Sequence, residues 1–210
     1  MNIKVDLVIP CGRDPKRLPV LLSNIRICKA VTQSKNMVVM PYVVMSDSEP
    51  WEELEEILIA GYDTAILVYD SPKGVNGVQS GTMAVLHAYE HHCQGDWVTS
   101  VGDDDLIFPW AFNMFEDAAD ADVIYGIVIP TYRGTYNAWP NTYIGYTHAP
   151  GQTGGNNVAY RLEALKTLPK PWCNIDSPTP DFDLSNNART NLRYKDTHVL
   201  MGVFNGLGGS

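Results

Sequence analysis

Three consecutive carboxylates, Asp103, Asp104 and Asp105, lie between two apolar segments at residues 97–101 and 106–108. At an effective dielectric of about 20, two unit charges roughly 4 Å apart repel by about 4 kcal/mol, so solvent, a basic partner or a cation must offset that repulsion. Clustered carboxylates suit Mg²⁺ or Mn²⁺, which proteins hold with one or two side chains plus the phosphate oxygens of a substrate. The alternative is an exposed acidic turn that caps a helix beginning near Pro109.

A second acidic pair, Asp181 and Asp183, lies in the sequence PDFDL. A carboxylate in such a place can act as a general base, taking the proton from an acceptor hydroxyl while that oxygen attacks the anomeric carbon of a sugar. The alternative role is helix capping, because aspartate at the start of a helix satisfies unpaired backbone amides. The two roles are compatible, and the residues alone leave both open.

Histidines offer two further candidates for metal chemistry. His198 precedes an apolar run, and neutral imidazole is a good ligand for Mn²⁺, although a lone histidine in that setting is more often structural. His87 and His91 have the i, i+4 spacing that can bind zinc, but no glutamate occupies the metalloprotease position. We interpret these two and His92 as surface or groove residues.

The elements that must position these residues alternate between strands and helices. Continuous apolar runs predict strands at residues 5–10, 37–47 (with an interruption at Pro41), 64–70, 96–102, 121–130 and 197–204. Helical spacing predicts helices at residues 18–30, 49–61, 80–95, 109–119 and 158–168, with another in the second part of 177–192. This alternation indicates an α/β fold with a mostly parallel central sheet flanked by helices. Ligands bind beyond the carboxyl ends of such strands, which is where the acidic triplet falls.

Bulk composition disfavours several classes of protein. The 210 residues predict one domain, and the net charge of −9 disfavours a nucleic-acid acceptor and binding to anionic membranes. The sequence shows neither a signal-peptide pattern nor the roughly 18 consecutive apolar residues of a membrane span. Its four cysteines match no zinc spacing, which favours reduced thiols in a cytoplasmic protein without a membrane anchor.

Several segments, taken in their order along the chain, resemble the GT-A fold glycosyltransferases that use nucleotide sugars, of the inverting family-2 type. The resemblance covers most of the chain in patches, and the order of the patches is its specific signal. The segments are VDLVIPCGRDPKRLPVLLSNI, YVVMSDSE, GVNGVQSGTMAVLHAYEHHCQGDWVTSVGDDD, HAPGQTGGNNVAYR and TPDFDL. The resemblance implies a Rossmann-like nucleotide-sugar-binding half at residues 1–105, an acceptor-side half at 106–204 and a flexible tail at 205–210.

The same resemblance implies roles for individual residues. It places donor contacts at Pro10, Arg13, Asp47, Lys73, Asn76, Asp103 and Asp104, with Asp47 reading the nucleobase. It implies metal ligation of Mn²⁺ or Mg²⁺ by Asp103, Asp105 and His198, and catalysis by Asp181 as base with Asp183 in support. The family's first metal-motif aspartate falls on Gly102 here, so the working pair is either Asp103 with Asp105, which we favour, or Asp104 with a neighbour.

The expected function is therefore a metal-dependent hexosyl- or pentosyltransferase that moves a sugar from a nucleotide-diphosphate donor, a UDP-sugar being favoured, to an acceptor hydroxyl. The acceptor is a glycan, a small molecule or another hydroxyl-bearing substrate. Two alternatives stand beside it: a nucleotidyltransferase acting on a sugar phosphate, and a non-catalytic module that binds nucleotide sugars. The segment after the first strand, PCGRDPKR, has only one glycine, which weakens the nucleotidyltransferase alternative. Aromatic residues between positions 132 and 146 suit the face of a sugar ring or a small satellite core.

Overall fold

The computed structural model describes residues 2–11, 17–32, 36–45, 52, 54, 56, 60–69, 78–116, 118–130, 157–174, 177 and 179–204. Its elements are β1 (Ile3–Cys11), α1 (Leu18–Thr32), β2 (Met37–Met45), β3 (Ala65–Val68), α3 (Val78–His91), β4 (Trp97–Ser100), β5 (Leu106–Ile107), the 3₁₀ helix η3 (Ala111–Phe115), β6 (Val123–Pro130), β7 (Val158–Arg161), α4 (Leu162–Lys166), α5 (Pro180–Asn191) and β8 (Tyr194–Phe204).

One mixed sheet organises the described chain, with the strand order β3-β2-β1-β4-β7-β6-β8-β5. Strands β1, β2, β3 and β4 are parallel to one another, and β6 is parallel to β8. The antiparallel strand β7 joins β4 to β6, and the two-residue strand β5 pairs antiparallel with the end of β8. The sequence-based expectation of a mostly parallel α/β sheet is confirmed.

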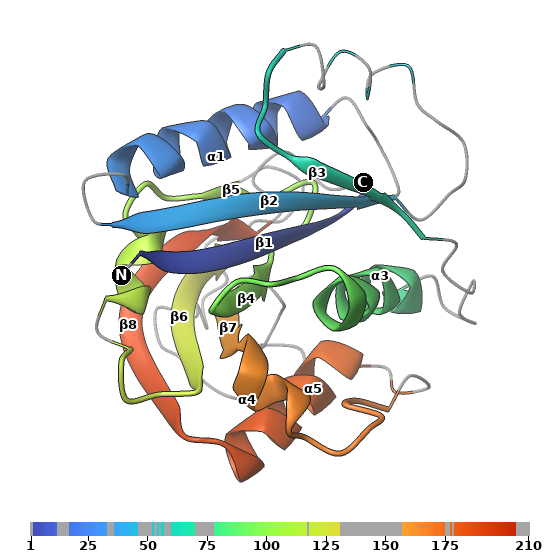
Figure 1. Cartoon of the computed structure of the whole chain (residues 1–210), viewed down its shortest axis with the longest axis vertical. Helices are drawn as coiled ribbons and strands as arrows, with labels where there is room; N and C mark the ends of the chain where they lie inside the picture. Colours follow the sequence, from blue (N-terminus) through green and yellow to red (C-terminus); the bar gives the residue numbers. More distant parts are fainter. Residues whose placement is uncertain are drawn as a thin grey trace.

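Helices cover both faces of this sheet (Figure 1). Helix α1 and η3 pack on one face, where Leu7 of β1 joins Leu21 of α1 in one buried cluster. Helices α3, α4 and α5 pack on the other face, where Val8 of β1 joins Ala88 and Leu184 in a second cluster. Successive residues of β1 thus point into different cores, which explains why a strand buried on both faces has a continuous apolar sequence.

The start of β4 is fixed to β1 by a buried carboxylate. Asp6 is 4% exposed, and its Oδ2 accepts hydrogen bonds of 2.7 Å from the backbone amides of Gln94 and Gly95. Burial raises the pKa of Asp6, and the two amide bonds oppose that rise because they stabilise the charged form. This contact sets the point at which the chain enters β4, and so the place where β4 delivers the acidic triplet.

Three details of the predicted elements are wrong. Strand β2 runs through Pro41 without interruption, because β3 pairs with β2 only from Tyr42 onward and the missing N–H removes no bond to β3. Residues 158–161, predicted as the start of a helix, form the buried strand β7, and only Leu162–Lys166 is helical. Strand β8 begins at Tyr194 rather than 197, and the pairing of β5 with it was not predicted.

Candidate functional site

The acidic triplet lies at the carboxyl edge of the parallel strands, beside the point where the strand order reverses. Strand β1 has β2 on one side and β4 on the other, so the connections leaving β1 and β4 diverge there. The Val101 amide still donates to the Val8 carbonyl at 3.0 Å, which keeps the end of β4 against β1. In open α/β sheets, ligands usually bind beyond the carboxyl ends of the strands, at the point where the strand order reverses.

The three carboxylates have different environments. Asp103 and Asp105 are buried, at 8% and 2% exposure, whereas the side chain of Asp104 is 17% exposed. Oδ2 of Asp105 accepts a 2.8 Å hydrogen bond from the Gly102 amide, and the Asp105 amide donates to the Gly102 carbonyl at 3.2 Å. Asp105 therefore closes the turn that carries the triplet, and Asp104 is its most accessible carboxylate.

A basic residue lies beside the triplet. Arg17, immediately before α1, has its Nη1 3.9 Å from Oδ2 of Asp104. Both side chains are mostly buried, at 19% and 17% exposure, so solvent screens this pair less than it screens a surface ion pair. Sequence reasoning proposed Arg13 for this region and missed Arg17. The sequence signal for Arg17 is its position directly before the predicted helix that follows the first strand.

The chain after the triplet is held tightly by α1 and β8. The Asn24 side chain donates to the Ile107 carbonyl at 2.9 Å and accepts from the Ile107 amide at 2.8 Å. On the other side of β5, Gly202 of β8 pairs with Ile107, and a Cβ at Gly202 would lie 2.1 Å from the Leu106 carbonyl oxygen. Only glycine fits so close an approach, and the triplet is consequently fixed at both ends.

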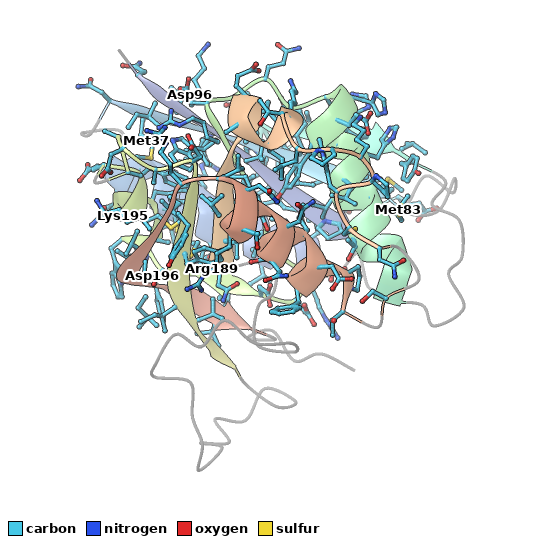
Figure 2. The ribbon with its side chains drawn as sticks, turned by 90° about the horizontal axis from the view of Figure 1, so that it is seen from below. Met37, Met83, Asp96, Arg189, Lys195 and Asp196 are labelled. Atoms are coloured by element: carbon cyan, nitrogen blue, oxygen red, sulfur yellow. The ribbon has the colours of Figure 1, made fainter. Side chains whose placement is uncertain are left out.

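The second acidic pair begins helix α5. Oδ1 of Asp181 accepts a 2.9 Å hydrogen bond from Oγ1 of Thr82, on α3, which joins the two helices that lie side by side in Figure 2. Burial raises the pKa of Asp181, and the Thr82 bond opposes the rise. Burial, together with repulsion from Asp181 and Asp183, raises the pKa of the Cys173 thiol to about 11, so this thiol is neutral at pH 7.

The predicted helix-capping role of this pair takes a different form. The residue at the N-cap of α5 is Thr179, and the Asp183 amide donates to the Thr179 carbonyl at 3.1 Å. The Asp181 carboxylate turns to Thr82 instead, although the positive end of the helix still favours its charged form. Thr82 was not identified from the sequence, because nothing local marks a threonine that meets a residue 99 positions away.

Of the remaining candidate residues, the structure describes Pro10 and the backbone of His198. Pro10 is partly exposed in β1, close to its end. His198 belongs to β8 within an irregularity of the β6–β8 pairing, where Tyr125 pairs with Asp196 and Ile127 with Leu200. Such bulges re-aim side chains and are frequent beside active sites. Several candidates lie outside the described residues: the side chain of His198, Arg13, Asp47, Lys73, Asn76, the aromatic residues 132–146 and the predicted tail 205–210.

His87, His91 and His92 lie near the opposite end of α3 from Thr82. The ring of His87 stacks on Tyr69 at 4.0 Å between centroids, and the rings of His91 and His92 lie 4.7 and 5.3 Å from it. Burial and repulsion from these two neighbours lower the pKa of His87. His91 is exposed and the other two are partly exposed, as expected for surface or groove residues.

Within the described ranges, no three His, Cys, Asp or Glu side chains converge in a way that would enclose a metal ion. The acidic triplet still fits Mn²⁺ or Mg²⁺, because a metal bound to a diphosphate needs only one or two carboxylates from the protein.

The four cysteines are buried and form no disulfide. No helix in the described part of the chain is long and apolar enough to cross a bilayer.

No protein-family model and no curated protein sequence matches this chain. Solved structures do match its fold. TarS from S. aureus (residues 1–349) has a TM-score of 0.62 at 16% identity, covering 96% of this chain and 60% of that one. The mannosyltransferase PcManGT from Pyrobaculum calidifontis, in complex with GDP-Man and Mn²⁺, has a TM-score of 0.68 at 16% identity and covers 97% and 57%.

A nucleotidyltransferase matches as well. The inositol-1-phosphate CTP transferase from T. maritima has a TM-score of 0.53 at 13% identity, covering 91% of this chain and 84% of that one. The present chain thus spans somewhat under two thirds of TarS and PcManGT but most of the CTP transferase. It has a GT-A-like fold, the nucleotide-binding α/β fold that transferases using nucleotide sugars share with nucleotidyltransferases.

Proposed function

We propose that this protein is a metal-dependent inverting glycosyltransferase that uses a nucleotide-diphosphate sugar. The observation that carries the proposal is the approach of Arg17 to Asp104, 3.9 Å apart beyond the carboxyl end of β4, on a fold shared with a mannosyltransferase that holds GDP-Man and Mn²⁺. A diphosphate bound there would accept the arginine as a hydrogen-bond donor and share a divalent ion with the carboxylates.

The metal ligands come, in this proposal, from the triplet. The accessibility of Asp104 supports it as the carboxylate nearest the diphosphate, with Asp103 beside it. The hydrogen bond that Asp105 accepts from the Gly102 amide supports a role for Asp105 in shaping the loop. The pair predicted from sequence, Asp103 with Asp105, is the alternative. When bound, the ion would neutralise the negative charge that develops on the departing nucleoside diphosphate.

Asp181 is the proposed general base, and the predicted support from Asp183 stays part of the proposal. The Asp181 carboxylate lies at the start of α5, and α5 and α3 both begin at the carboxyl edge of the sheet. In the ionised form it would take the proton from the acceptor hydroxyl as that oxygen attacks the anomeric carbon, with inversion there. Burial raises its pKa toward the operating pH, which suits a group that must accept a proton and then release it.

A nucleotidyltransferase is the second candidate, supported by the match to the CTP transferase over 84% of that chain. Both reactions need a cation on a polyphosphate, but they differ in what the acceptor half must supply. A sugar phosphate attacks with an oxygen that is already ionised, so that reaction needs no buried base. The environment of Asp181 therefore favours glycosyl transfer. A non-catalytic nucleotide-sugar-binding module would retain donor binding without turnover.

The test combines binding with turnover. The melting temperature is measured with UDP-sugars, GDP-sugars and CTP, each with and without Mn²⁺, and any stabilising donor is then assayed for transfer and slow hydrolysis. We expect a nucleotide sugar to raise the melting temperature only with the metal, and Asp104→Asn to remove that effect. Loss with Asp103→Asn and Asp105→Asn but not Asp104→Asn would select the sequence-predicted pair. Stabilisation by CTP, with pyrophosphate release from CTP and a sugar phosphate, would replace the proposal by the second candidate.

A further inference from the structure

The hydrogen bond between Thr82 and Asp181 connects the two predicted halves of the molecule. Thr82 lies in the second turn of α3, the helix that follows the predicted donor residues Lys73 and Asn76, whereas Asp181 begins α5 on the acceptor side. The two atoms, Oγ1 and Oδ1, are 2.9 Å apart and partly buried. Figure 2 shows α3, which carries Met83, alongside α5.

Among the described residues, the groups that interact electrostatically with Asp181 include three buried side chains whose own negative forms are disfavoured. They are Tyr89, Tyr160 and Cys173. The Tyr89 phenol bonds Ser100, and the Tyr160 phenol bonds Ser185. Within the part of the chain that the structure describes, Thr82 is the one side chain recorded as donating to the Asp181 carboxylate.

A threonine hydroxyl in this position does two things. By donating to Oδ1 it fixes the rotation of the carboxyl group, so that the other oxygen points in a defined direction. It also stabilises the ionised form relative to the protonated form, since an ionised carboxylate accepts a stronger hydrogen bond than a neutral acid does. Both effects are what a general base requires, since it must be ionised before transfer and must face its substrate.

We infer that Thr82 is a positioning residue for catalysis: its hydroxyl orients the Asp181 carboxylate and stabilises the form that accepts a proton. This role rests on the proposed function, in which Asp181 is the base. In this role Thr82 acts through Asp181 rather than by binding the donor. The placement of Thr82 on α3 also gives the donor-side helix a direct contact with the base, so a shift of α3 would move the carboxylate.

The test compares Thr82→Val, which keeps the shape and removes the hydroxyl, with Thr82→Ser, which keeps the hydroxyl. Thr82→Ala is a second variant without the hydroxyl in case valine prevents folding. We expect kcat below neutral pH to fall roughly ten-fold in Thr82→Val, the size expected for losing one hydrogen bond to a charged group. The acid limb of the pH profile moves to higher pH, the donor KM stays unchanged, and Thr82→Ser restores both kcat and the limb.

Thr99→Val is the matched control, because Thr99 is also buried, at 2% exposure against 8% for Thr82, and its Oγ1 donates at 2.8 Å to the Val158 backbone carbonyl rather than to a carboxylate. It should lower stability and leave the acid limb in place. A Thr82→Val enzyme whose acid limb stays in place would overturn the inference. So would Thr82→Ser behaving like Thr82→Val.

A titration that needs no turnover separates this inference from the proposed function. The ¹³C carboxyl resonance of Asp181, assigned with Asp181→Asn, is followed with pH in wild type and in Thr82→Val. A higher pKa in Thr82→Val supports control of the base by Thr82, and an unchanged pKa overturns it. Absence of transfer in wild type with every donor would instead refute the proposed function, whatever the titration gives.

Discussion

The close approach of β8 to β5 predicts that Gly202→Ala displaces the acidic triplet. The added Cβ would lie 2.1 Å from the Leu106 carbonyl oxygen and 3.2 Å from the Ile107 Cα, and both are backbone atoms that cannot rotate away. Reaching 3.0 Å, the closest separation that real Cβ atoms tolerate, requires β5 to move by about 0.9 Å. Leu106 directly follows Asp105, so the movement passes to the triplet.

The energetic cost has two parts. Overpacking in a tightly packed region costs about 1–3 kcal/mol, and loss of one backbone hydrogen bond costs about 1 kcal/mol more. The bond at risk joins the Phe108 amide to the Met201 carbonyl at 2.8 Å. We therefore expect Gly202→Ala to lower the free energy of unfolding by about 2–4 kcal/mol and to weaken metal-dependent donor binding at least ten-fold, even where the variant remains folded.

Gly81→Ala is the control. Its Cβ would lie 3.9 Å from the Pro10 Cβ, an ordinary contact, and alanine is favoured over glycine in a helix by up to about 1 kcal/mol. Urea unfolding of both variants measures stability at constant slope, and calorimetric titration with Mn²⁺ and donor measures binding. Wild-type stability and donor affinity in Gly202→Ala would refute the link between β8, β5 and the triplet.

Two further predictions concern pH. Because the pKa of Asp181 is raised above 3.8, the folded state holds that proton more tightly than the unfolded state, and stability falls as pH rises from 3.8 through the raised value. Asp181→Asn should therefore be more stable than wild type at pH 7, with the difference vanishing below pH 3.8, while transfer falls at least about 100-fold; equal stability at both pH values would contradict this. The pKa of Asp122 is lowered, first by the side-chain bonds from Arg193 at 2.8 Å, so this pair contributes stability above pH 3.8 that is lost as pH falls through the lowered value. Arg193→Met should be less stable than wild type at pH 7 and equal to it in acid; a difference that persists in acid would show that packing of the arginine stem, rather than charge, is responsible.

Sequence reasoning found the parallel half of the fold because its signals are local. The continuous apolar runs of β1 and β4 reflect burial on both faces, and the helical spacing from Leu18 onward reflects one buried face of α1. Local signals failed where the partner is remote. Residues 158–161 form a strand because β4 and β6 flank them, although their apolar pattern suits a helix equally well.

The site divides in the same way. The triplet is recognisable because its carboxylates directly follow an apolar run, and PDFDL is recognisable because it resembles the family's acidic motif. Arg17 and Thr82 are part of the candidate site only through contacts with residues 87 and 99 positions away, and no spacing rule applies to such contacts. The order of Gly202 and Leu106 along the chain likewise gives no sign that the two backbones touch.

The proposed function requires a divalent ion that bridges the acidic triplet to a diphosphate. Anomalous diffraction at the manganese edge, on crystals grown with Mn²⁺ and a nucleotide sugar, tests it most directly. The account predicts an anomalous peak within bonding distance of at least one carboxylate of residues 103–105 and of a phosphate oxygen. A nucleotide sugar bound beside the triplet with Arg17 on the carboxylates, and no manganese there, would contradict it.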